Sequence, residues 1–141
     1  VFGVFLAQLI NDAPLTVVGD GAQTRDFTFV SDIVDAVIAA SEAEGRAGPY
    51  NIGSGGTYSV KRLAELLGAK QIAYIPKRPG EPDCTFADIS KIEREIGWRP
   101  RVSFEDGVGV MLDNIAYWRD APLWTPDKIA DATKDWFKYL K

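Results

Sequence analysis

Residues 19–30 read Gly-Asp-Gly-Ala-Gln-Thr-Arg-Asp-Phe-Thr-Phe-Val, a polar loop that joins two apolar segments. The apolar run Leu15–Val18 ends at the first glycine, and apolar residues resume at Phe27. Glycine takes positive φ without a steric cost, so two glycines around an aspartate predict a tight turn. We expect strand-like segments on both sides to hold the loop in a defined place.

One cation, Arg25, stands in the polar part of this loop. A guanidinium offers a planar fork of donors that suits a phosphate, so the loop is interpreted as half of a phosphate-binding site. The alternative is a hairpin-like connection in which Arg25 forms a weak surface ion pair with Asp26 or Asp32.

The chain has 141 residues, of which 46% are hydrophobic and 26% charged, as in an ordinary soluble domain with a moderate core. The net charge of −4 argues against nucleic-acid binding, and no apolar run approaches the roughly 20 residues of a membrane span. A single cysteine, Cys84, excludes an internal disulfide and favours a reducing, cytoplasmic location. Histidine, the commonest metal ligand, is absent, and we expect no metal site.

Helices and short strands alternate along the chain. Apolar spacing predicts a helix over Phe2–Ile10, while Leu15–Val18 and Gln71–Ile75 are typical of strands and Phe27–Val30 of a strand or extended segment. Further helices are expected after caps at Ser31 or Asp32, at Thr57 or Ser59, at Asp88, at Ser103 (over Phe104–Trp118) and at Thr125. The pattern predicts an α/β fold with few short strands, too little sheet for a complete doubly wound domain.

The helix after Ser31 carries Ile33, Val34, Val37 and Ile38 at helical spacing. An apolar stripe of this kind normally faces the core, so these four side chains are expected to be buried.

A second charged loop reads Lys-Arg-Pro-Gly-Glu at residues 77–81. The turn-prone Pro-Gly pair leaves Arg78 and Glu81 projecting from a constrained loop. The arginine can bind a phosphate, and the carboxylate can accept hydrogen bonds from ribose hydroxyls, as carboxylates do in dinucleotide sites. The alternative is a solvated charged loop.

Asn51 stands at a strand end beside a glycine-rich loop, where its amide can bond either a ligand or neighbouring backbone. The loop Gly53–Gly56 lacks the Gly-Lys-Ser/Thr ending of a P-loop, and Gly19–Gly21 lacks the third glycine of a dinucleotide fingerprint. Neither loop is therefore interpreted as a nucleotide motif by itself.

Taken in order, these pieces resemble the extended short-chain dehydrogenase/reductase family, and within it the NAD(P)-dependent nucleotide-sugar epimerases and dehydratases. The resemblance covers roughly residues 1–115 and its strength lies in the order and spacing of its motifs. The matching segments are residues 14–21, 23–32, 50–53, 78–81, and 87–91 leading to 96–100.

In that family a Rossmann domain binds NAD or NADP, and a smaller C-terminal part binds the nucleoside-diphosphate sugar. This chain resembles only the second part, because the family's glycine-rich cofactor fingerprint and its Tyr-x-x-x-Lys pair are absent. The start at Val1, without an initiator methionine, agrees with this interpretation. We expect residues 1–141 to be the substrate-binding domain of a longer homodimeric enzyme and to be inactive alone.

The resemblance implies roles for individual residues. Arg25 and Arg78 would hold the diphosphate from two sides, and Glu81 would bind the nucleotide ribose. Backbone groups of Thr16 and Val18 would meet the edge of the base, with the Val18 side chain against the ring. Asn51 would support the arginine loop or contact the ligand.

Residues 116–141 fall outside the resemblance and are interpreted as a family-specific helical tail that packs on the missing domain or on another subunit. Two other functions stay open. One is a reductase or lyase of the same family whose substrate is not a nucleotide sugar, which the paired arginines argue against. The other is a non-catalytic binding module with the same fold.

Overall fold

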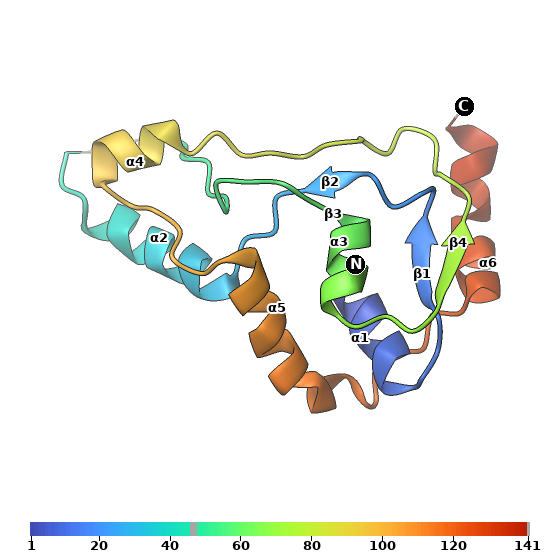
Figure 1. The fold of residues 1–141 in the computed structure, drawn as a ribbon. Coiled ribbons are helices and arrows are strands. Elements are labelled where there is room, and N and C mark those ends of the chain that lie inside the picture. Colours follow the sequence, from blue (N-terminus) through green and yellow to red (C-terminus); the bar gives the residue numbers. More distant parts are fainter. Residues whose placement is uncertain (46–47, 141) are drawn as a thin grey trace. The chain divides into compact units, whose positions relative to one another are not determined.

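The computed structural model describes residues 1–45 and 48–140. The chain divides into two compact units, each built from separate stretches of sequence. The first unit contains Val1–Gln23, Ser59–Asp83 and the chain from Val108 onward, and the second contains Thr24–Tyr58 and Cys84–Gly107. Figure 1 labels the elements in chain order.

The first unit is built around two parallel strands, β1 (Leu15–Val18) and β4 (Ile72–Ile75), which lie side by side in Figure 1. Leu15 pairs with Ile72 and Val18 with Ile75, so the carboxyl ends of both strands lie together. Helices α1 (Phe2–Ile10) and α3 (Val60–Leu66) pack on β1, and the 3₁₀ turn η1 (Ile115–Trp118) packs on α1. The buried side chains include Phe5, Leu6, Leu15, Val17 and Leu63.

Several predictions for this unit are confirmed. Helix α1 and strand β1 have the predicted bounds, and the predicted strand Gln71–Ile75 appears as β4 without its first residue. Ser59 caps α3, since its hydroxyl accepts a hydrogen bond from the N–H of Arg62 at 3.0 Å.

The turn after β1 requires its glycines. Gly19 and Gly21 have φ of 60° and 77°, in the left-handed region. A Cβ at Gly21 would also lie 2.9 Å from Cγ1 of Val17, so a larger residue would push the turn off the strand. The predicted tight turn is confirmed.

The second unit holds helices α2 (Val30–Glu42) and α4 (Ser90–Ile96) and the start of α5 (Phe104–Asp113). Its core contains Ala36, Ile92 and Trp98, surrounded by partly buried side chains that include Tyr50 and Ile52. Phe104 stacks on Phe27 and on Tyr58, with ring centroids 5.1 and 4.3 Å apart. Strand β2 (Thr24–Arg25) pairs with β3 (Tyr58–Ser59).

The predicted cap of α2 is wrong. The helix begins at Val30 with Phe29 as N-cap, and no side chain there accepts a capping hydrogen bond. Asp32 is only 2% exposed, and its two carboxylate oxygens accept the backbone N–H groups of Arg101 and Val102, each at 3.1 Å. A contact distant in sequence has replaced the local cap.

Of the two alternatives predicted for Phe27–Val30, the strand is absent, because strand pairing stops at Arg25, whereas Phe29 at the start of α2 has an extended backbone. In its place, Phe27 is fixed through its ring against Phe104.

The buried face predicted for α2 is wrong as well. Its buried residues are Asp32 and Ala36, whereas Val34, Val37 and Ile38 are each about half exposed. The apolar stripe exists, but the core of the unit lies against the neighbouring side of the helix.

The predicted helix Phe104–Trp118 is shorter than expected. Helix α5 ends at Asp113, and η1 follows it. The amide of Asn114 donates to the Val110 carbonyl at 2.8 Å, a side-chain bond that competes with helix continuation.

Two other helix starts agree with prediction, since Ser103 accepts the N–H of Asp106 and Thr125 caps α6 (Pro126–Tyr139). The predicted cap at Asp88 is wrong: α4 begins at Ser90 with Ile89 as N-cap, and the Asp88 carboxylate accepts the N–H of Ser90 just before the helix without capping it. The parallel β1–β4 pair among helices confirms the α/β class. No helix within the described residues is long and apolar enough to span a bilayer.

Candidate functional site

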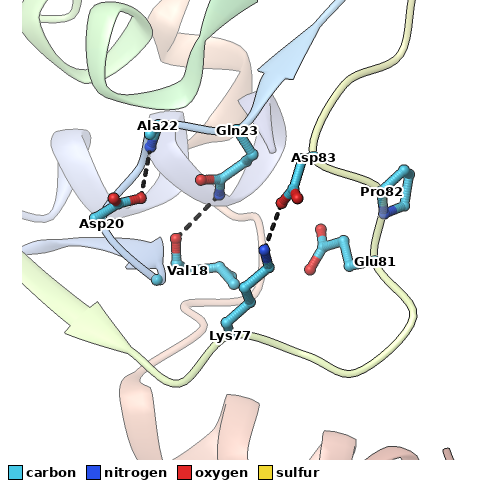
Figure 2. A pocket seen from close by; sticks show the side chains of 9 residues that line it. Val18, Asp20, Ala22, Gln23, Lys77, Glu81, Pro82 and Asp83 are labelled. Atoms are coloured by element: carbon cyan, nitrogen blue, oxygen red, sulfur yellow. Dashed lines mark hydrogen bonds and ion pairs between the residues drawn. The ribbon is translucent and has the colours of Figure 1, made fainter.

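A pocket of about 210 Å³ lies in the first unit, between the turn after β1 and the loop after β4 (Figure 2). Because β1 and β4 are parallel, both segments leave the strands at the same edge. Ligands of α/β proteins bind at this edge, outside the carboxyl ends of the strands. The lining residues are Val18, Gly19, Asp20, Ala22, Gln23, Lys77, Glu81, Pro82 and Asp83.

Hydrogen bonds within the turn fix one wall of the pocket. Asp20 accepts the backbone N–H of Ala22 at 2.9 Å, and the Gln23 amide donates to the Val18 carbonyl at 3.0 Å, as Figure 2 shows. The Val18 carbonyl also accepts the N–H of Gly21 at 3.3 Å. This carbonyl, one of the backbone groups predicted to meet a base, is therefore used by the turn itself.

The charged side chains that line the pocket are mainly acidic. Asp20, Glu81 and Asp83 stand around a single lysine, Lys77, which forms an ion pair with Asp83 (Figure 2). The hydrogen bond and the charge of Asp83, followed by the charges of Asp20 and Glu81, raise the pKa of Lys77. A wall of this charge suits a neutral ligand group that donates hydrogen bonds better than it suits a phosphate.

Arg78 and Glu81 lie next to each other in the loop after β4. Nε of Arg78 lies 3.1 Å from Oε2 of Glu81, and both side chains are about a quarter exposed. The Glu81 N–H donates to the Arg78 carbonyl at 3.3 Å, and Gly80 has a φ of 74°. The loop is constrained as predicted, but the two side chains meet each other.

The backbone N–H and the hydroxyl of Thr16 are hydrogen-bonded inside the first unit. Its backbone N–H donates to Oε1 of Gln8 at 3.1 Å, and its hydroxyl accepts from Nε2 of Gln8 at 2.9 Å. Both residues are buried. The Thr16 N–H therefore serves the interior of the first unit and is not available to a base.

Arg25 and Asn51, the remaining predicted residues, belong to the second unit. One terminal nitrogen of Arg25 donates to the Thr24 carbonyl at 2.8 Å. The amide of Asn51 donates to the Asp88 carbonyl at 3.3 Å, which is the backbone alternative that the sequence left open.

Asp26 is the residue that ties the arginine loop of the second unit together. Its carboxylate accepts the N–H of Ser54 at 2.7 Å and the N–H of Ala87 at 3.1 Å. A Cβ at Gly53 would lie 2.4 Å from Oδ2 of Asp26. The close approach at this glycine is therefore to the protein's own carboxylate.

Sequence reasoning missed Gln23, Lys77, Asp83 and Trp136 as residues of the site. Gln23 lies inside a motif that the sequence had already singled out, Lys77 is the first residue of the predicted loop, and Asp83 lies two residues after its end. Trp136 had no local signal, because its indole N–H donates to the Pro79 carbonyl, 57 positions away. Within residues 1–45 and 48–140, no group of acidic, cysteine or histidine side chains could hold a metal ion.

Known proteins resemble this chain over most of its length. Residues 4–111 match the family model described as GDP-mannose 4,6 dehydratase. UDP-glucuronic acid decarboxylase 1 of Arabidopsis thaliana is 35% identical over 115 residues, which are 78% of this chain and 26% of that protein. A dTDP-glucose 4,6-dehydratase of Xanthomonas campestris pv. campestris (strain B100) is 35% identical over 124 residues, 77% of this chain and 35% of that one.

The fold agrees with the sequence match. The crystal structure of UDP-glucuronic acid 4-epimerase from Bacillus cereus, in complex with UDP-glucuronic acid and NAD, is similar with a TM-score of 0.76 and 34% identity. The match covers 82% of this chain and 39% of the epimerase, so the chain spans about a quarter to two fifths of the length of these relatives. The chain belongs to the GDP-mannose 4,6 dehydratase family and is homologous to the nucleotide-sugar epimerases, decarboxylases and dehydratases of the extended short-chain dehydrogenase/reductases.

Proposed function

We propose that this chain is the part of an NAD(P)-dependent sugar epimerase or dehydratase that binds the nucleoside-diphosphate sugar. The observation that carries the proposal is the position of Arg78 and Glu81 on one constrained loop beside the pocket at the carboxyl ends of β1 and β4. The names of the relatives supply the ligand class, since they act on UDP, dTDP and GDP sugars.

The nucleoside fits the pocket better than the diphosphate does. A volume of about 210 Å³ is below the roughly 300–1,000 Å³ of pockets that enclose a whole drug-sized ligand, so one portion of the substrate enters. Ribose hydroxyls are neutral donors, and Glu81 is a carboxylate that can accept two of them. The Val18 side chain supplies an apolar surface for the base.

Arg78 is proposed to bind the diphosphate at the edge of this pocket. Its bond to Glu81 is made by Nε, and a guanidinium has four further N–H donors. Arg78 can therefore keep its carboxylate partner while it takes up a phosphate oxygen. The sequence assigns Arg25 to the same diphosphate, and substitution by alanine tests both arginines.

The residues of this chain do not fit the cofactor. The glycine-rich loop of the second unit approaches Asp26 and Ala87 at Gly53, and the pocket of the first unit has an acidic wall. We propose that NAD or NADP, and the residues that perform the chemistry, belong to the part of the enzyme outside this chain. The contribution of this chain is to hold the sugar in a fixed orientation.

The proposal is tested by calorimetric titration of UDP, dTDP and GDP, and of their glucose or mannose conjugates, into the chain. Loss of one charge-assisted bond costs about 1.5–3 kcal/mol, so Arg78→Ala should weaken binding roughly 10- to 150-fold. Arg25→Ala is expected to weaken it in the same direction.

Arg94→Ala is the matched control, because Arg94 is an exposed arginine of α4 paired with its neighbour Glu95. It should leave the affinity unchanged. Equal affinities for the wild type and for both Arg78→Ala and Arg25→Ala would refute the diphosphate assignment.

A further inference from the structure

Helix α6 lies beyond residues 4–111, the part of the chain that matches the family, yet it reaches the Arg78 loop. We infer that Trp136 of α6 is a positioning residue that holds this loop in the conformation that binds a nucleoside diphosphate. The inference rests on the proposed function, because it needs Arg78 to be a ligand of the diphosphate.

Two contacts join Trp136 to the loop. The indole N–H donates to the Pro79 carbonyl at 2.7 Å, and the Arg78 guanidinium carbon lies 5.3 Å from the centroid of the indole ring. Indole is a donor only, and its face attracts a cation, so one side chain fixes the backbone of the turn and the head group of the arginine together.

Arg78 is thereby held by Glu81, through the bond at Nε, and by the ring of Trp136. Arginine carries a large rotamer entropy, which it loses when it binds a phosphate. Contacts that order the side chain before the ligand arrives reduce that loss. Removal of the ring should therefore weaken binding through Arg78 without removing any group that touches the ligand.

The helix is itself anchored to the first unit. Thr125 caps its first turn, and the preceding carbonyl, that of Trp124, accepts from Nε2 of the buried Gln8 at 2.6 Å. Gln8 belongs to α1, so the start of the tail is attached to the core while Trp136 contacts the loop at the other end of the helix. Such a helix can act as a brace for the loop.

The test uses the 141-residue chain and titrates UDP by calorimetry. Trp136→Leu should weaken binding roughly three- to tenfold, and Trp136→Phe, which keeps a ring but lacks the N–H, should weaken it less. Phe137→Leu is the matched control, since Phe137 is the adjacent aromatic of α6 and is exposed to the same extent, 39% against 38%. It should bind UDP as the wild type does.

A double-mutant cycle with Arg78→Ala separates positioning from general destabilisation. If Trp136 acts through Arg78, the effect of Trp136→Leu should vanish in the Arg78→Ala background. Additive effects in the cycle, or a Trp136→Leu variant that binds like the wild type, would overturn the inference and leave the proposed function intact. A wild-type chain that binds UDP no better than Arg78→Ala would overturn the inference, and one that binds no better than either Arg78→Ala or Arg25→Ala would overturn the diphosphate assignment as well.

Trp136→Phe keeps the test decisive if the leucine variant fails to fold. In that case an affinity of Trp136→Phe equal to that of the wild type contradicts a role for the indole N–H. A reduced affinity that disappears in the Arg78→Ala background supports the inference.

Discussion

Replacement of Gly53 by alanine should destabilise the second unit, because the site of the new methyl group is already filled. An ideal Cβ would lie 2.4 Å from Oδ2 of Asp26 and 2.7 Å from Cβ of Ala87. Gly53 does not adopt a left-handed conformation, so the cost comes from contact and not from backbone strain. Asp26 cannot move without loss, because its carboxylate accepts the N–H groups of Ser54 and Ala87.

The size of the effect follows from the two ways of relieving this contact. If the backbone shifts and Asp26 keeps its bonds, the cost is that of overpacking, about 1–3 kcal/mol. If the carboxylate moves away, the unit loses bonds to a charged acceptor that contribute about 1.5–3 kcal/mol each. The route with the lower cost is overpacking, so we expect the free energy of unfolding to fall by about 1–3 kcal/mol.

Urea unfolding followed by circular dichroism measures this loss, and Gly109→Ala is the matched control. Gly109 lies inside α5, and a Cβ there would meet nothing within 4 Å. Alanine is favoured over glycine in a helix by about 0.5–1 kcal/mol, so the same substitution should stabilise the protein at this position. The reasoning is refuted if Gly53→Ala unfolds at the same urea concentration as the wild type or as Gly109→Ala.

Two further predictions concern carboxylates of the second unit. Asp32→Asn should lower the free energy of unfolding in urea by about 2–3 kcal/mol, because the amide oxygen replaces only one of the two oxygens that accept backbone N–H groups. The control Asp35→Asn removes an exposed ion pair with a 3.9 Å separation and should cost under about 1 kcal/mol. Equal losses for the two variants would contradict a structural role for the buried Asp32 carboxylate. Hydrogen bonds from the backbone of Ser90 and, to a smaller extent, from its side chain lower the pKa of Asp88 below its ordinary 3.8. The ionised carboxylate therefore stabilises the folded protein above pH 3.8, and this stabilisation is lost as the pH falls through the lower pKa of the folded state. Asp88→Asn should remove this part of the pH dependence in acid-unfolding curves, and superimposable curves for the two proteins would show that the charge has no role.

Local signals in the sequence predict much of the first unit. The spacing of apolar residues gives the bounds of α1 and β1, and the glycines around Asp20 give the turn. A hydroxyl before an apolar-periodic segment gives the caps at Ser59 and Thr125. Each of these signals acts within about four residues of the chain, so it does not depend on contacts with distant parts of the sequence.

Contacts distant in sequence account for the errors. Asp32 has the local pattern of an N-cap, but its partners, Arg101 and Val102, stand 69 and 70 positions away, and a bond between buried groups outweighs a solvated cap. The stripe of α2 shows the same limit. Periodicity identifies Val37 as one of an apolar set, yet it cannot say which side of the helix the core occupies.

The same difference between local signals and contacts distant in sequence applies to the candidate site. Arg78 and Glu81 could be predicted because their loop carries its own turn chemistry in Pro-Gly. The hydrogen bond from the Thr16 N–H to the buried amide of Gln8 could not be predicted, because Gln8 lies eight positions away on α1. The contact of Trp136 with Pro79 could not be predicted, because a tryptophan on an amphipathic helix gives no indication of which carbonyl it will reach.

The contacts of Asp26 also change how the family motifs in the second unit are understood. The motif around Arg25 and the motif that ends at Gly53 suggest two ligand contacts when they are considered separately. In the structure they form one packed unit, because Gly53 leaves the space into which the Asp26 carboxylate fits. Since Asp26 follows Arg25 directly in the chain, the hydrogen bond from the N–H of Ser54, 28 positions from Asp26, helps to fix the backbone beside the arginine. A residue of a family motif can therefore serve the ligand without touching it, and Gly53 is such a residue if Arg25 binds the diphosphate.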